Sequence, residues 1–212
     1  MNIFYLDNDV DVCASHMVDS HVVKMQLESM QLLSTALRMT RGVNEDIVDD
    51  FGRVHTMNIL EGETLLLMDV CVATFEDGVV KRLKVREDKK LPRGVVYLEV
   101  VLQKPYYDPS TQVALAMTHE NHPSSVWVRK SIENYNWLKA MTYALEREWK
   151  RRYNHSSETR HKSVLFLDKM PHPDLPSSGF TEPTPAMPEE YKIVDDSIAS
   201  YWNYYRAEKL ML

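Results

Sequence analysis

The sequence predicts a mainly α-helical fold with a small antiparallel β insert, an α+β class in which long helices pack around a cleft. Segments 14–39 and 125–153 place apolar residues at helical spacing. Between them, segment 65–103 holds β-branched runs separated by turn residues. The chain has 212 residues, 44% hydrophobic and 26% charged, a composition typical of one ordered domain. We therefore expect residues 1–212 to form a single domain with residues 65–103 as its insert.

The N-terminal half begins with a short apolar and aromatic stretch, Asn2–Leu6, which runs into an Asp- and Asn-rich turn. The helix predicted over 14–39 ends before Gly42, because glycine is common just past a helix end. Segment 43–64 has mixed character and is predicted to be weakly helical. The insert is predicted to form a hairpin with an Asp-Gly turn, followed by a third strand; the three strands are Val70–Phe75, Val79–Val85 and Val95–Leu102.

The C-terminal half is predicted to contain a long helix, an extended loop and a final helix. Pro123 and the two serines that follow it mark the start of the long helix, which runs to about Tyr153. Residues 154–190 hold six of the ten prolines, so they are expected to wrap over the surface as a loop. An amphipathic helix is predicted over 195–211.

Charge and composition limit the class of protein. The net charge of −6 argues against a generic nucleic-acid coat, but segment 125–162 carries nine lysines or arginines against four acids. One basic face therefore remains compatible with a nucleic-acid ligand. Cys13 and Cys71 lack metal-ligand spacing and are predicted to be reduced thiols. The sequence shows no signal peptide and no apolar run of the ~20 residues that a membrane span needs, so we expect a cytoplasmic protein.

A polar stripe runs along the first long helix, with apolar residues on both shoulders. It consists of His21, Lys24, Glu28 and Gln31. One interpretation is an ordinary Lys24–Glu28 ion pair one turn apart. The other is that Glu28 sits in a pocket, where apolar neighbours raise its pKa. It would then serve as acid, base or cation stabiliser, with His21 and Lys24 adjusting its charge.

A second group of polar residues, His119-Glu120-Asn121-His122, comes just before the second long helix. Two histidines three residues apart without a third ligand are a weak metal motif, and no cofactor is expected. Anion contact by His119, His122 and the following amides is one interpretation, and helix capping is the other. Asn134 lies on the apolar side of the helix, so it either braces the helix or reaches into the cleft.

A third group gathers near the C-terminus as Tyr201, Trp202, Tyr204 and Tyr205. These side chains cannot all point inward from one helix. Exposed rings beside Arg206 suit base stacking, whereas buried rings would anchor the helix on the core. The sequence leaves both interpretations open.

The order of these motifs resembles that of the phage pyrimidine-dimer DNA glycosylases of the endonuclease V type. Segment Ala14–Leu37, with Asp19-x-His21 and Glu28, is similar to their first helix, and Trp202-Asn203-Tyr204-Tyr205 is similar to their aromatic tail. The chain is still more similar to a set of longer phage-encoded relatives. The shared motifs cover about two thirds of the chain, without the β-rich insert; they are MNIFYLD at 1–7, DSHVVKMQLE at 19–28, NHPSSVW at 121–127 and FTEPTPAMP at 180–188.

The resemblance implies a mostly helical DNA-repair enzyme that binds double-stranded DNA with a damaged or modified pyrimidine, in the host-cell cytoplasm if phage-encoded. It implies that the amine of Met1 attacks the sugar C1′ and that Glu28 promotes glycosidic cleavage and β-elimination. Lys24 is an alternative nucleophile. Leu27 and Gln31 stand where the family has arginines. The residues expected to contact DNA are Asn2, Gln31, His119, Asn121, His122, Trp127, Arg129, Asn134, Trp202, Tyr204 and Tyr205.

Three functions follow from these patterns. The leading hypothesis is a glycosylase, with or without lyase activity at abasic sites. The second is a base-hypermodification enzyme on the same scaffold, favoured by the missing arginines beside Glu28. The third is a non-enzymatic module that binds nucleic acid or a host protein, favoured by the net acidity. The oligomeric state stays open.

Overall fold

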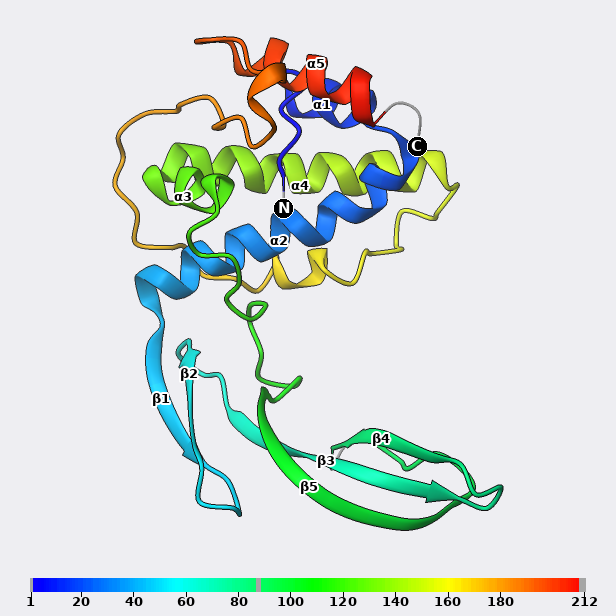
Figure 1. The fold of residues 1–212 in the computed structure, drawn as a ribbon. Coiled ribbons are helices and arrows are strands. Elements are labelled where there is room, and N and C mark those ends of the chain that lie inside the picture. The colour runs from blue at the N-terminus through cyan, green and yellow to red at the C-terminus, as the bar shows by residue number, and fades with distance from the viewer. Residues whose placement is uncertain (1, 87–88, 210–212) are drawn as a thin grey trace. The chain divides into compact units, whose positions relative to one another are not determined.

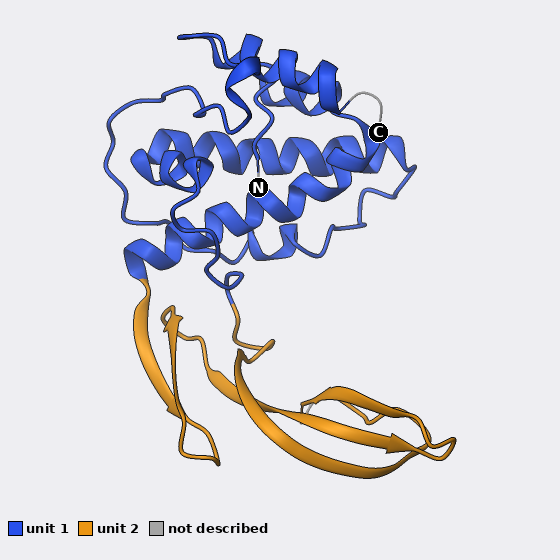
Figure 2. Ribbon diagram, in the orientation of Figure 1, with its two compact units in different colours: residues 1–41, 113–212 blue, residues 42–112 orange. Residues whose placement is uncertain are grey.

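The computed structural model describes residues 2–86 and 89–209, which contain five α-helices and five β-strands. The chain divides into two compact units, residues 1–41 with 113–212 and residues 42–112 (Figure 2). All the helices lie in the first unit and all the strands lie in the second (Figure 1). The predicted α+β class is confirmed. The insert is a compact unit of its own and is wider than the segment 65–103 predicted for it.

Each long helix predicted from the sequence is interrupted near its start. The first forms α1 (Val10–His16) and α2 (Asp19–Arg41), because Met17 is extended. The second forms α3 (Pro123–Lys130) and α4 (Ile132–Arg152), because Ser131 is extended and its hydroxyl caps α4. The last helix is α5 (Ser197–Glu208). Among the described residues, no helix combines the length and apolarity that crossing a bilayer requires.

The core of the first unit surrounds the N-terminal segment. In Figure 1 this segment runs from α5 past α4 toward α2. Ile3 through Leu6 are at most 5% exposed, so the chain is buried from its third residue. The side chains packed around it come from α1, α2, α4 and α5; they include Cys13, Met25, Met141, Leu145, Tyr201 and Tyr205.

The loop 154–190, all of which the structure describes, contains one short 3₁₀ turn, Val164–Phe166, and ends in a second, Glu189–Tyr191. Its apolar piece is anchored, since Val164 and Leu167 are at most 1% exposed. The loop therefore packs on the first unit through a few apolar side chains.

The second unit contains two antiparallel sheets. β1 (Val43–Val48) pairs with β2 (Val54–Ile59), and a three-stranded sheet has the order β4-β3-β5. The strands of the larger sheet are β3 (Leu65–Phe75), β4 (Val80–Val85) and β5 (Val95–Tyr107). The predicted hairpin and third strand are confirmed. The weak helix predicted over 43–64 is wrong, because the turn between Val48 and Val54 pairs this segment as a hairpin.

Asp49 organises the turn between β1 and β2. Its carboxylate accepts hydrogen bonds from the backbone N–H groups of Phe51 and Arg53 (3.0 and 2.9 Å). Arg53 Nε and His55 Nε2 lie 2.7 and 2.9 Å from Oδ2. Burial acts to raise the pKa of Asp49, but hydrogen bonds from His55 and Arg53 outweigh it and hold the pKa well below its ordinary value.

We expect Asp49→Asn to weaken the β1–β2 hairpin, because the amide keeps a backbone acceptor but loses the charge that faces Arg53 and His55. In the unmodified chain, the ionised Asp49 stabilises the hairpin fully at pH values above the ordinary carboxylate pKa of about 4. The stabilisation is lost as the pH falls below that value, because Asp49 then takes up a proton. Hydrogen exchange at the Arg53 amide, followed from pH 7 to pH 3, measures both effects. Glu45→Gln, on the exposed part of β1, is the control; equal exchange in the two variants would contradict the prediction.

Candidate functional site

Glu28 lies in the middle of α2 and binds the start of the described chain. The backbone N–H of Asn2 donates to Glu28 Oε2 at 3.0 Å, and Lys24 Nζ lies 3.1 Å from Oε1. The Glu28 side chain is 13% exposed and that of Lys24 is 67% exposed. The ion pair predicted one turn apart is therefore present, and its carboxylate is mostly buried.

Asn2 is fixed by a second contact. Its side-chain Nδ2 donates to the carbonyl of Ala186 at 2.9 Å, and its Oδ1 accepts from the Ile3 N–H at 2.8 Å. Two residues later, Phe4 has φ of 52°, a left-handed conformation that costs a non-glycine residue about 1–3 kcal/mol. Surrounding packing therefore holds this segment in a strained path beside Glu28. Met1, the predicted nucleophile, lies outside the described residues.

His21 lies on the same helix and is held between two aromatic side chains. Its ring stacks on Phe4, with centroids 4.5 Å apart and planes 15° apart, and its Nδ1 lies 2.9 Å from the Tyr205 hydroxyl. That hydroxyl accepts the Val18 N–H at 2.8 Å, so we assign its proton to the bond with His21 Nδ1. This assignment leaves the proton of the neutral ring on Nε2.

The pKa of His21 is lowered, first by burial and then by the charges of Lys209 and Lys24, while Glu28 opposes the shift. We expect Lys24→Gln to raise this pKa, because one cation that disfavours the imidazolium is removed. NMR titration of the His21 ring measures it, and Lys162→Gln, which changes an exposed cation elsewhere, is the control. An unchanged or lower titration midpoint of His21 in Lys24→Gln would contradict the prediction.

The lowered pKa of His21 also makes the stability of the fold depend on pH. Because the folded ring binds a proton less tightly than the unfolded one, acid below about pH 6.5 favours unfolding.

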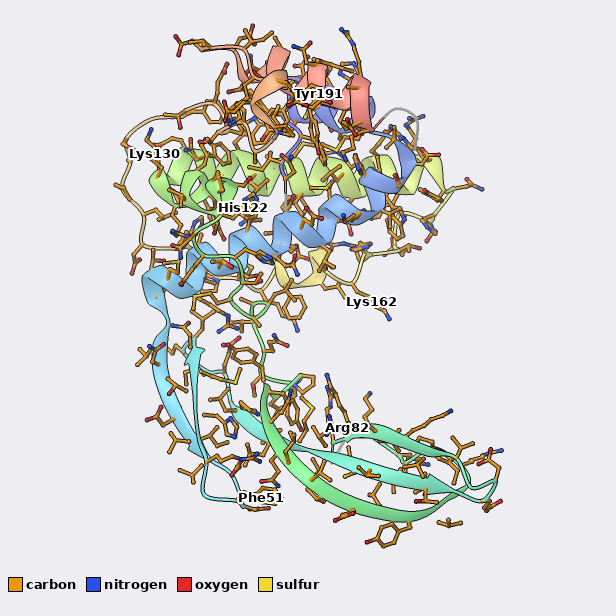
Figure 3. The ribbon with its side chains drawn as sticks, in the orientation of Figure 1. Phe51, Arg82, His122, Lys130, Lys162 and Tyr191 are labelled. Atoms are coloured by element: carbon orange, nitrogen blue, oxygen red, sulfur yellow. The ribbon has the colours of Figure 1, made fainter. Side chains whose placement is uncertain are left out.

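The loop before α3 carries His122, which Figure 3 labels, and the charge of Glu28 acts on its ring. His122 Nδ1 accepts the Ser124 N–H at 3.2 Å and so caps the helix. Its pKa is lowered, mainly by burial; the neighbouring His119 adds to the lowering, and Glu28 opposes it. His119 is exposed with φ of 51°, and its Nδ1 lies 2.6 Å from the Thr118 hydroxyl. The capping interpretation is thus confirmed for His122, and Asn121 lies exposed between the two histidines.

Trp127 and Asn134 connect α3 and α4 to the loop at Thr181. Asn134 Nδ2 donates to the Trp127 carbonyl and to Thr181 Oγ1, both at 3.0 Å, and its Oδ1 accepts the Thr181 N–H at 2.9 Å. Trp127 Nε1 donates to the Thr181 carbonyl at 2.8 Å. Both residues are at most 2% exposed. Of the two interpretations of Asn134, the structure shows the brace; Trp127 acts with it.

The C-terminal aromatic group packs on the N-terminal segment. Tyr201 and Tyr205 are 0% exposed, and Trp202 Nε1 donates to the Leu6 carbonyl at 2.9 Å. Tyr204 is half-buried and lies parallel to Phe4, with ring centroids 6.4 Å apart. The anchoring interpretation therefore accounts for these rings, which position the chain near Glu28.

The basic run over 125–162 is largely occupied by contacts within the protein. Arg152 pairs with Glu148 and Asp19 and also donates to two backbone carbonyls, and Arg160 pairs with Glu146 and Asp168. Arg147 forms an exposed pair with Asp11, and Arg151 pairs with the buried Glu148. Arg129 donates to the Glu120 carbonyl and to the Ser125 hydroxyl. The free basic face expected from the sequence is therefore reduced mainly to the exposed Lys130 and Lys162 and the half-buried Lys139.

Segments distant in the sequence meet around Asn2. Its backbone reaches Glu28 and its side chain reaches Ala186, while Gln31 is half-buried one turn beyond Glu28. No family model, curated protein or solved structure matches this chain. Sequence reasoning missed Phe4 and Ala186, although the aromatic character of the first residues was a signal for Phe4. Ala186 contributes only a backbone carbonyl, which no side-chain pattern reveals.

Proposed function

We propose that this protein is a DNA glycosylase that acts on a damaged or modified pyrimidine in double-stranded DNA, with lyase activity at the resulting abasic site. The observation that carries the proposal is the 3.0 Å hydrogen bond from the Asn2 N–H to Glu28. One residue of chain spans at most about 3.6 Å, so an amine one residue before Asn2 is a candidate nucleophile beside this carboxylate. The resemblance to the pyrimidine-dimer glycosylases points to the same pair.

The chemistry needs an amine and a carboxylate in one place. The amine attacks C1′ of the deoxyribose, and the bond from C1′ to the base breaks with its electron pair leaving on the base. Loss of the amine proton and opening of the sugar ring give an imine. Glu28 stabilises the positive charge that develops on the sugar. It then accepts the proton removed from C2′ during β-elimination, in which the bond from C3′ to oxygen breaks and the 3′ phosphate leaves with the electron pair. Water then hydrolyses the imine and frees the amine.

Lys24 is the alternative nucleophile. Its amine lies 3.1 Å from Glu28 Oε1, and its side chain is 67% exposed, so a sugar can approach it. A lysine amine forms the same imine as a terminal amine. The two candidates differ in which residue carries the covalent adduct.

In this proposal, the substrate approaches Glu28 of α2 beside the loop before α3. The target base leaves the duplex stack to reach Glu28, as enzymes that act on a base require. Gln31, His119 and His122 are the side chains proposed to contact it, and Asn121 and Arg129 lie on or beside the same loop. His21 supports the site through Phe4 and Tyr205.

The test is reduction with borohydride during incubation with duplex oligonucleotides. One duplex carries a thymine dimer, one an abasic site and one a hypermodified pyrimidine; an undamaged duplex is the control. We expect a protein–DNA adduct that peptide mass spectrometry assigns to Met1 or to Lys24. DNA binding without an adduct on any of these duplexes would overturn the imine mechanism.

A second candidate function is modification of a pyrimidine in DNA on the same scaffold. Leu27 and Gln31 flank Glu28 on α2, where the resembling family has arginines that contact DNA. An altered nucleoside in the product, detected by mass spectrometry of digested DNA, would support this function over glycosidic cleavage.

A further inference from the structure

The second unit carries a dense group of cations that the candidate site does not use. Segment 81–93 contains seven lysines or arginines against the two acids Glu87 and Asp88. Three of these cations belong to β4, at the edge of the three-stranded sheet. Figure 3 marks Arg82 on this strand.

Strand register places several cations on one face of this sheet. Arg82 lies opposite Val72, and Lys84 lies opposite Val70. Lys104 of β5 lies opposite Met68. Because directly paired residues share a face and alternate residues of a strand do too, Arg82, Lys84 and Lys104 lie on the same face. All three side chains are exposed.

Aromatic rings lie on the same face. Tyr97 pairs with Thr74 and Tyr106 pairs with Leu66, two positions in the same alternate row of β3. Tyr97 is 59% exposed, and the guanidinium carbon of Arg86 lies 4.9 Å from the centroid of the Tyr106 ring. One acid, Glu99, lies opposite Val72 on this face. We call Arg82, Lys84, Arg86, Tyr97, Lys104 and Tyr106 the basic sheet face.

The opposite face of the sheet has a different character. Cys71 and Ala73 point to it and are 0% exposed, and their partners on β4 and β5 include Leu83, Leu98 and Val100. Lys81, opposite Ala73, and Asp69 also lie on this face, so its charges cancel, whereas the basic sheet face carries three strand cations against the one acid Glu99. Such an antiparallel sheet exposes its polar face to water or to a charged ligand.

From this arrangement we infer that the basic sheet face is a DNA-binding surface that contacts phosphates of the strand backbone. Alternate residues along a strand lie about 6.7 Å apart, and phosphates of one DNA strand advance about 3.4 Å per nucleotide along the axis. Arg82 and Lys84, one such step apart on β4, and Arg86 just beyond its end therefore offer a row of cations to phosphates of one DNA strand. The tyrosine rings add a sequence-independent contact by stacking on exposed bases. The inference rests on the proposed function in taking DNA as the ligand.

A second copy of the chain is the competing occupant, because segment 45–77 carries nine acids and one arginine. Several of these acids already have partners within their own unit. Asp49 pairs with Arg53 and His55, and Asp50 and Asp69 both accept hydrogen bonds from Gln103 Nε2 at 2.8 Å. The structure therefore favours DNA over an acidic surface of another copy.

The experiment measures how DNA affinity depends on salt, with full-length protein and a fluorescent duplex between 50 and 200 mM NaCl. Removal of one phosphate contact lowers the slope of log K against log salt by about 0.9. We expect the triple variant Arg82→Gln, Lys84→Gln, Lys104→Gln to lose about 2.7 from that slope. A triple variant with equal charge change outside both basic segments, Arg41→Gln, Lys169→Gln, Lys192→Gln, is the control and keeps the slope. Equal slopes in the wild type and the first triple variant would overturn the inference.

A single aromatic substitution separates stacking from charge. We expect Tyr97→Ala to weaken binding to a single-stranded oligonucleotide without changing the slope, because stacking releases no counterions. Phe51→Ala, which removes an exposed ring from the turn between β1 and β2, is the control. If the two variants bound the single-stranded oligonucleotide equally well, the Tyr97 ring would make no contribution to binding.

The outcomes separate this inference from the proposed function. Salt-sensitive binding that depends on the basic sheet face, without any borohydride adduct, would overturn the imine mechanism of the proposed function and support the surface. An adduct with an unchanged slope in the triple variant would support the glycosylase and overturn the surface. Failure to bind DNA, together with self-association that salt and the triple variant abolish, would overturn DNA as the ligand in favour of a second copy.

Discussion

The Glu28→Gln variant is expected to form the borohydride adduct at least about 100-fold more slowly than the wild type, since positioned acid–base groups contribute about 10²–10⁴-fold. The amide oxygen can still accept the Asn2 N–H, so the start of the chain stays in place. A neutral amide cannot stabilise a cationic sugar or take up a proton at neutral pH. Single-turnover rates on the duplex that gives the adduct measure the effect.

Glu120→Gln is the matched control, because it removes one exposed carboxylate from the loop beside His122. It is expected to react at the wild-type rate. Both variants are compared with the wild type by circular dichroism and thermal unfolding, so that a folding defect is recognised. A folded Glu28→Gln variant with wild-type rates would remove Glu28 from the catalytic assignment.

The Asn134→Ala variant is expected to lower the free energy of unfolding by about 3 kcal/mol, because each buried polar group left without a partner costs about 1–3 kcal/mol. The amide makes three hydrogen bonds, to the Trp127 carbonyl and to the backbone and side chain of Thr181. For a chain of this size, the expected fall in Tm is about 6–12 °C. Urea denaturation and thermal scans measure the two quantities.

Asn136→Ala is the control for that variant, since Asn136 is exposed on the same helix. Its stability is expected to stay within about 0.5 kcal/mol of the wild type. If Asn134→Ala changed the free energy of unfolding as little as Asn136→Ala does, the hydrogen bonds from Asn134 would not be what holds Thr181 in place. Faster hydrogen exchange at the Thr181 amide in Asn134→Ala would show that the loop has been released.

Helical periodicity accounts for what the sequence predicted around Glu28. Residues three and four apart must share a face of a helix, so the Lys24–Glu28 pair and the neighbouring His21 followed from spacing alone. The breaks at Met17 and Ser131 did not, because each depends on the backbone conformation of a single residue. Asn134 was placed correctly on the buried side, but its partner Thr181 is 47 residues away, beyond any local pattern.

The β1–β2 hairpin shows why other elements escaped prediction. Five of the six residues of β1 are exposed, so the strand lacks the alternation of apolar and polar residues that marks a half-buried strand. Its turn depends on Asp49 contacts with Arg53 and His55, which become visible only when the chain has folded back. The aromatic tail was ambiguous for a similar reason, because its partner is the segment at the opposite end of the sequence.

The burial of residues 3–6 has a consequence for how the protein is made. Hydrogen bonds join Asn2 to Ala186, Val18 to Tyr205 and Leu6 to Trp202 across 184, 187 and 196 residues. Synthesis adds about 5–20 residues per second. About 10–40 s therefore pass between the synthesis of Phe4, Tyr5 and Leu6 and that of the C-terminal segments that cover them. The second unit is continuous in sequence and can fold during that interval. The first unit is completed only when nearly the whole chain has emerged.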